Sequence, residues 1–187
     1  MYGEGVLTSE GQRRLLVIAR EALEARVRRR PTPPVALADG PDILAAAFVS
    51  IHRHGALRGC LGRLEHDWPL PALVAHLGEA LADQDPRFHP VTPEELVEIA
   101  IEISVLTPER AIASPADIEV GRHGLVVEHG SRRGLLLRQV ATDRGWDRIT
   151  FLEHTCVKAG LPKNAWQNGA RVFVFESVVF GEDDAPA

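Results

Sequence analysis

The sequence is poor in cysteine, in aromatic residues and in positive charge. Its 187 residues include two cysteines, Cys60 and Cys156, which excludes a framework of several disulfides and a four-cysteine metal site. Aromatic residues make up 5% of the chain, and 26 acidic residues outnumber 21 basic ones. Few aromatic rings and a net charge of −5 disfavour a nucleic-acid-binding protein.

Long apolar runs are also missing. No stretch approaches the ~20 consecutive apolar residues that a membrane helix needs, and the N-terminus lacks the apolar segment of a secretory signal. Hydrophobic residues make up 45% and charged residues 25%, as in ordinary globular proteins. We therefore expect a cytoplasmic protein without membrane contact, folded as a single domain over residues 1–187.

The chain begins with helical signals. Ser9 and Gln12 have the spacing of a capping box, and apolar residues recur on one face over residues 15–27. Three arginines at 28–30 then lie where the helix dipole favours cations, and they fit a solvated helix end better than a nucleic-acid patch. A stiff proline-rich connector is expected at about residues 31–34.

Strand and helix signals recur in both halves of the chain. Residues 47–52 and 57–64 predict a hairpin around the turn His54-Gly55, distorted at Gly59 or Gly62. The fold class is therefore α+β, with two lobes of antiparallel β-strands and packed helices. The remaining expected elements are a helix over 70–81, a helix start at Thr92 to Glu95, a strand over 99–106, a hairpin over 125–128 and 134–137, a helix over 147–160, a buried strand over 172–180, and a frayed acidic tail at 182–187.

The unusual segment is Leu-Arg-Gly-Cys-Leu-Gly at residues 57–62. Its glycines remove side chains around Cys60, which lets a ligand or another backbone approach closely. In an extended strand Arg58 and Cys60 point to the same face, where a guanidinium favours a thiolate. The alternative is a small buried cysteine in a tightly packed bulge.

These six residues resemble the hallmark of the AMMECR-one domain family, protein A of the AmmeMemoRadiSam system, with Leu61 in place of isoleucine. The stretch Asp85-Pro86-Arg87-Phe88 is similar to the family's Asp-x-Arg-Phe loop, and residues 101–108 are similar to its following strand and turn. Further similar segments are Gly134 to Leu136, Gln139 to Ala141, Trp146-Asp147, Phe151-Leu152, Cys156, Lys158 to Leu161 and Trp166.

The resemblance runs from about Val6 to Phe180. It implies an α+β fold of two lobes and a pathway shared with Memo-like and radical-SAM proteins. It names no substrate, reaction or cofactor. Arg138 departs from the family, which usually has a proline there, and this leaves the local backbone open.

The candidate catalytic residues are Cys60 as nucleophile, Arg58 to stabilise the thiolate or an anionic substrate, and His89 or Asp85 to handle the proton. We expect the loop of residues 85–89 to pack next to Cys60.

Arg87, Gly59 and Gly62 are the candidate substrate-binding or partner-binding residues of this site. In the alternative interpretation the loop is a structural tether, with Phe88 buried and Asp85 paired to Arg87.

Other candidates are weaker. A two-residue turn, which we favour, would pair His52 with Leu57 and Val49 with Cys60, so that His52 faces away from the cysteine. A three-residue turn would instead bring His52 opposite Arg58, on the face of the cysteine. Cys156 lies on an apolar helix face, which predicts core packing. No two histidines have helical i, i+4 spacing, so no metal site is expected. Two function classes stay open: an enzyme component acting on a small anionic or carbonyl substrate, and a non-catalytic adaptor presenting the same groove to a partner protein.

Overall fold

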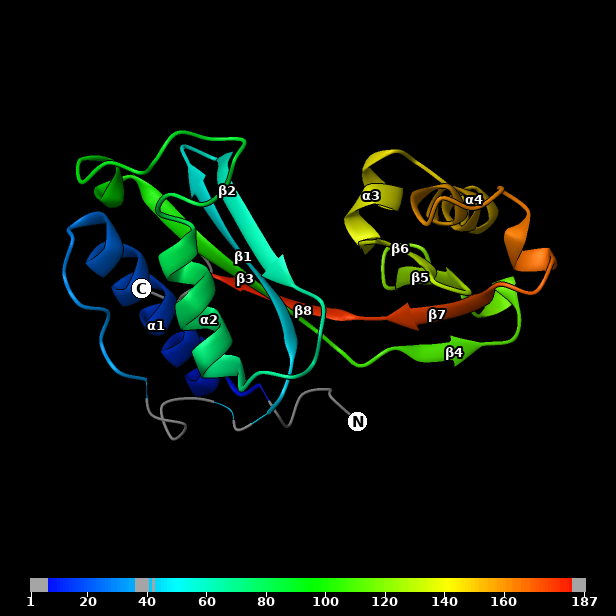
Figure 1. Ribbon diagram of the computed structural model, residues 1–187, viewed down its shortest axis with the longest axis horizontal. Helices are drawn as coiled ribbons and strands as arrows, with labels where there is room; N and C mark the ends of the chain where they lie inside the picture. The colour runs from blue at the N-terminus through cyan, green and yellow to red at the C-terminus, as the bar shows by residue number, and fades with distance from the viewer. Residues whose placement is uncertain (1–6, 36–40, 42, 183–187) are drawn as a thin grey trace. The chain divides into compact units, whose positions relative to one another are not determined.

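The computed structural model describes residues 7–35, 41 and 43–182, and the chain divides into two compact units. Unit 1 comprises Met1–Leu106 and Val178–Ala187, and unit 2 comprises Thr107–Ser177. Each unit holds a four-stranded sheet of antiparallel strands and its own helices (Figure 1). The expected α+β class with two lobes of antiparallel strands is confirmed. Every helix among the described residues is too short or too polar to span a lipid bilayer.

Unit 1 packs two helices against one face of a sheet with the strand order β2-β1-β3-β8 (Figure 1). Apolar residues at alternate positions of β1 and β3 face these helices and form the core. The elements are α1 (Ser9–Val27), β1 (Ala46–Arg53), β2 (Ala56–Arg63), α2 (Leu70–Ala80), the 3₁₀ turn η2 (Glu95–Val97), β3 (Ile99–Leu106) and β8 (Ser177–Gly181).

The start of α1 differs from expectation by one residue. Thr8 is the N-cap, and its hydroxyl accepts a hydrogen bond from the Gly11 amide. Gln12 donates instead to the Leu7 carbonyl, so the Ser9–Gln12 capping box does not form. The helix itself covers the expected residues because the apolar stripe packs against α2 and β3.

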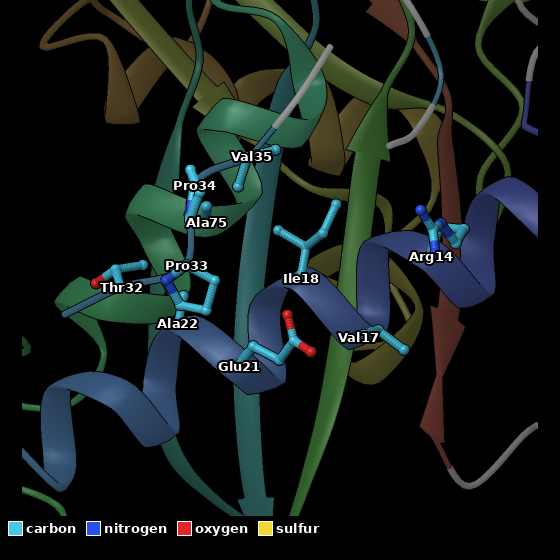
Figure 2. A pocket seen from close by; sticks show the side chains of 10 residues that line it. All are labelled: Arg14, Val17, Ile18, Glu21, Ala22, Thr32, Pro33, Pro34, Val35 and Ala75. Carbon is cyan, nitrogen blue, oxygen red and sulfur yellow. The ribbon is translucent and has the colours of Figure 1, made fainter. Parts of the chain in front are cut away.

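The connector after α1 runs back along the helices. Residues 32–35 lie beside Ala22 of α1 and Ala75 of α2, and together they enclose a small hollow of about 130 Å³ (Figure 2). Val35 packs against the unit 1 core. The prolines therefore direct the chain over the helix pair, as their fixed φ angles suit.

The β1–β2 hairpin has the expected two-residue turn, with His54 and Gly55 both at positive φ (52° and 78°). Its register contains a β-bulge, because His52 pairs with Leu57 whereas Ile51 pairs with Gly59. Arg58 is the extra residue. The second strand is distorted as expected, but at Arg58 and not at Gly59 or Gly62.

The bulge shifts the pairing of the next residues by one position. The expected pairing of Val49 with Cys60 is wrong: Cys60 lies opposite Ser50. The error came from extending the turn register along a strand that carries an extra residue, which reverses the face that each partner presents.

Unit 2 packs its helices on a second sheet with the strand order β4-β7-β5-β6. Its core is made by β5, α4 and β7 and includes Cys156. The elements are β4 (Arg110–Ile112), the 3₁₀ turn η3 (Pro115–Asp117), β5 (Gly124–His129), β6 (Arg132–Leu136), α3 (Arg138–Asp143), α4 (Arg148–Lys158), the 3₁₀ turn η4 (Ala165–Gln167) and β7 (Arg171–Phe175).

The single strand expected over residues 172–180 is two strands in two sheets. β7 lies inside the unit 2 sheet, between β4 and β5, whereas β8 is an edge strand of the unit 1 sheet. The break falls at Glu176, whose amide donates to the Thr107 hydroxyl and whose carbonyl accepts from the Thr107 amide. Glu176 and Ser177 interrupt the apolar run at this point, and this interruption is the sequence signal that the expectation of a single strand overlooked.

Two local expectations are resolved by helix ends. Arg138 is the first residue of α3, a position where proline is favoured because its amide needs no helical partner. Thr92 to Glu95 leads into one 3₁₀ turn, not a longer helix, although the Thr92 amide does donate to the Glu95 carboxylate.

Of the expected acidic tail, Glu182 is ordered and pairs with Arg20, and residues 183–187 lie outside the described residues.

Candidate functional site

The loop after α2 closes on Cys60, as expected from the sequence. The Cys60 amide donates to Asp85 Oδ2 at 2.9 Å, and Arg87 Nη2 donates to the Cys60 carbonyl at 2.9 Å. Because β2 is an edge strand, these side chains satisfy backbone groups that a neighbouring strand would otherwise pair. We call this arrangement of Asp85 and Arg87 on Cys60 the clamp.

The clamp is held by its own ion pair. Arg87 donates to Asp85 through Nε at 2.9 Å and through Nη2 at 2.7 Å. The Asp85 side chain is 3% exposed, whereas that of Arg87 is 55% exposed. The hydrogen bond from Arg87 outweighs burial and holds the pKa of Asp85 well below its ordinary value. Asp85 is therefore a fixed anion at neutral pH and carries no proton to exchange.

Arg58 pairs with Glu95, whereas its position in the sequence suggested the Cys60 thiol as its partner. Its Nε donates to Glu95 Oε1 at 2.8 Å, and its Nη2 donates to Glu95 Oε2 at 3.1 Å and to the His89 carbonyl at 2.9 Å. Arg58 and Glu95 are largely buried, and the hydrogen bond from Arg58 lowers the pKa of Glu95. The sequence alone did not indicate Glu95 as the partner of Arg58.

The guanidinium next to the thiol is that of Arg87. The pKa of Arg87 is raised, first by its hydrogen bond to Asp85 and also by the Cys60 side chain. Phe88 lies between the two arginines, with its ring centroid 5.5 Å from Arg87 Cζ and 5.9 Å from Arg58 Cζ. Phe88 is half-buried, and the side chain of His89 is exposed.

A polar row crosses the sheet on the face opposite the helices. Ser50 in β1 lies directly opposite Cys60 in β2 and directly opposite Glu102 in β3. Because the backbone groups of Cys60 bind the clamp and not β1, Cys60 and Ser50 form a non-hydrogen-bonded pair, in which side chains lie closest. We call Cys60, Ser50 and Glu102 the polar row.

The members of the polar row are half-buried. Among the residues that the structure describes, no hydrogen bond or ion pair engages the side chains of Ser50 or Glu102. His52 shares this face because it lies two residues from Ser50 along β1, so the expectation that it faces away from the cysteine is wrong. The alternation of β1 and β3 indicates that Ser50 and Glu102 share one face of the sheet. Placing them on the same face as Cys60 also requires knowledge of the bulge in β2.

The two glycines of the hexad make room for side chains of unit 1 itself. A Cβ on Gly59 would lie 3.1 Å from Ile51 Cγ1 and 3.2 Å from Leu81 Cδ2, in the core. A Cβ on Gly62 would lie 2.1 Å from Phe48 Cδ1, inside the aromatic ring. Packing thus explains both glycines without a ligand.

Cys156 is fully buried in the unit 2 core, which confirms its expected packing role. Burial raises the pKa of its thiol. No group of three or more His, Cys, Asp or Glu side chains within the described residues could hold a metal ion.

The chain is similar to known proteins over most of its length. The family described as AMMECR1 matches residues 16–180, which include parts of both units. A protein of Methanothermobacter thermautotrophicus is 43% identical over 95% of this chain and 97% of its own, and one of Methanosarcina acetivorans is 39% identical over 96% and 95%. The crystal structure of an uncharacterized protein from Pyrococcus horikoshii matches with a TM-score of 0.77 and 36% identity over 90% of each chain. The chain belongs to the AMMECR1 family.

Proposed function

We propose that unit 1 carries a Cys60-centred site that binds or modifies a small anionic or carbonyl compound. The observation that supports this most directly is that the half-buried Cys60 is bound by the clamp through its backbone and lies next to Ser50 in the polar row. The clamp fixes the backbone of Cys60 on both sides, and so limits the positions of its Sγ atom. Arg87 supplies positive charge on one side, and Ser50 and Glu102 supply proton acceptors on the other.

The chemistry that fits this arrangement is addition of a thiol to a carbonyl group. Cys60 Sγ forms a bond to the carbonyl carbon, and the π electrons move to the oxygen, which Arg87 stabilises. The thiol proton passes to Ser50 Oγ while the Ser50 proton passes to the Glu102 carboxylate. Glu102 suits this role because, within the described chain, no cation neutralises it. Asp85 and Arg58 act as positioning residues, since each is committed to its own ion pair.

The family resemblance supports a further proposal about the pathway in which the protein works. We propose that the protein works in the cytoplasm in a pathway with a Memo-like and a radical-SAM protein. A cysteine adduct formed at this site would be handed to, or received from, one of these partners. No cofactor of this chain is part of the proposal.

The test is comparative metabolite profiling of purified wild-type protein and Cys60→Ala, each with the Memo-like and radical-SAM partners. Cys156→Ala is the matched control, because it removes the other thiol from a buried position. We expect a metabolite that changes with wild type and with Cys156→Ala but not with Cys60→Ala. Identical profiles for wild type and Cys60→Ala would contradict the proposal.

A non-catalytic adaptor is the second candidate. The observation that favours it is that Arg58, Glu95, Asp85 and Arg87 satisfy one another and the adjoining backbone, which makes a rigid surface without a further ligand. An adaptor would bind its partner proteins equally well with Cys60→Ala. Full partner binding together with an unchanged metabolite profile would therefore favour the adaptor over the enzyme component.

A further inference from the structure

A second polar hollow lies at the C-terminal end of α1, within unit 1. Its volume is about 750 Å³, which falls in the range of small-molecule sites, roughly 300–1,000 Å³. Its basic lining residues are Arg26, Arg29 and Arg30. The apolar part of the lining, which we call the apolar side, comprises Val27, Pro31, Ala82, Pro90 and Val91.

Arg29 adopts a backbone conformation that normally selects glycine. The Arg30 amide donates to the Ala25 carbonyl at 2.7 Å and the Arg29 amide to the Arg26 carbonyl at 3.1 Å, which is the Schellman pattern that ends helices. In that pattern the residue at the position of Arg29 is left-handed, and its φ is 55°. A long charged side chain is therefore kept where a glycine would relieve strain.

The guanidinium groups of Arg29 and Arg30 are not engaged by other parts of the described chain. Both residues are exposed, and neither side chain makes a hydrogen bond or ion pair with a described residue. Arg26, by contrast, is paired with Asp83 at 2.9 Å. The hollow is thus lined by three guanidinium groups against two carboxylates, those of Glu79 and Asp83, and the two unengaged arginines leave positive charge for a ligand.

The helix end opposes an anion less than an uncapped end would. Three of the last four carbonyls of α1, those of Glu24, Ala25 and Arg26, accept hydrogen bonds from the amides of residues 28–30. Thr32 lines the same hollow, and its hydroxyl is a possible hydrogen-bond donor. Thr32 also begins the segment that lies over α1 and α2 in Figure 2, so the connector forms one wall of the hollow.

We propose that this hollow binds a phosphomonoester: a compact dianion held by Arg29 and Arg30, with its organic part against the apolar side. Two guanidinium forks match the charge and the oxygen geometry of a phosphate. Glu79 also lines the hollow, and its carboxylate would accept hydrogen bonds from hydroxyl groups of the organic part. The site is independent of the chemistry at Cys60, since no member of the clamp or of the polar row lines it.

The test measures binding of inorganic phosphate and of a nucleoside monophosphate to the full chain by calorimetry, in chloride buffers of matched ionic strength. Wild type should bind both, and the monophosphate more tightly because it also covers the apolar side. Arg30→Ala should weaken binding about tenfold, the usual loss when a charge-assisted hydrogen bond is removed. Arg28→Ala is the matched control, since Arg28 belongs to the same triplet and does not line the hollow.

Arg29→Gly separates binding from folding. Glycine removes the left-handed strain, so the melting temperature should rise by about 2–4 °C, whereas phosphate binding should fall about tenfold. Absence of phosphate binding in wild type would overturn the proposal. Equal losses in Arg28→Ala and Arg30→Ala would also overturn it, because they would indicate diffuse attraction. Binding of RNA without binding of either phosphate probe would replace it with a nucleic-acid surface.

Discussion

The two cysteines occupy opposite environments, one in each unit. Cys156 lies on α4 in the unit 2 core, fully buried among apolar side chains. Cys60 lies on the edge strand of the unit 1 sheet, half-buried, with ionic side chains bound to its backbone. The same residue type is thus a packing group in one unit and a positioned polar group in the other. Burial and hydrogen-bond partners decide which role a thiol has.

Removal of the clamp is the substitution with the largest expected effect on stability. Asp85→Ala should lower the free energy of unfolding by about 2–3 kcal/mol, because the Cys60 amide and the Arg87 guanidinium both lose a charge-assisted hydrogen bond. Urea unfolding followed by circular dichroism measures this loss. Asp85→Asn is the matched control, since its amide oxygen can still accept from Cys60, and it should lose less. Equal losses in the two variants would contradict the assigned role of the charge.

The same carboxylate predicts a pH dependence. The folded pKa of Asp85 is depressed, so its stabilisation is fully present above the ordinary carboxylate pKa, about 4, and is lost as the pH falls toward the folded value. Between pH 5 and pH 2, wild type should therefore lose more stability than Asp85→Asn. Parallel stability curves for the two proteins would contradict the depressed pKa.

Serine substitutions compare the two thiols directly. Cys156→Ser should destabilise the protein by about 1–3 kcal/mol, because it places a hydroxyl in an apolar core. Cys60→Ser should change stability by less than about 0.5 kcal/mol, as expected for a partly exposed side chain whose backbone contacts remain. Thermal melts of both variants measure the difference. If Cys60→Ser melted as early as Cys156→Ser, Cys60 would be a core residue.

Arg58→Ala is expected to have an intermediate to small effect, about 1–2 kcal/mol, on the free energy of unfolding. The substitution removes the partner of the largely buried Glu95 and the donor to the His89 carbonyl. Glu95→Gln is the matched variant, because it keeps the hydrogen-bond acceptor and removes the charge. An Arg58→Ala protein as stable as wild type would contradict the structural role and restore Arg58 as a candidate ligand-binding residue.

Much of unit 1 could be predicted from local patterns. The hairpin, its two-residue turn and the packing of the 85–89 loop on Cys60 followed from alternation, from His54-Gly55 and from the family resemblance. The bulge at Arg58 could not be predicted, because one extra residue in a strand leaves no periodic signal. That single residue moved Ser50, His52 and Glu102 into the neighbourhood of Cys60. The partnership of Arg58 with Glu95 joins residues 37 positions apart and depends on tertiary contacts alone.

The most direct test of the contrast is the rate at which each cysteine of the native protein reacts with iodoacetamide near neutral pH, followed by peptide mass spectrometry. Cys60 should be labelled first, because it is only half-buried and its thiol lies beside Arg87. Cys156 should react only after unfolding, because it is buried and its thiol pKa is raised. If Cys60 stayed unlabelled until the protein unfolded, as Cys156 does, Cys60 would be a packing residue and the proposed site would be refuted.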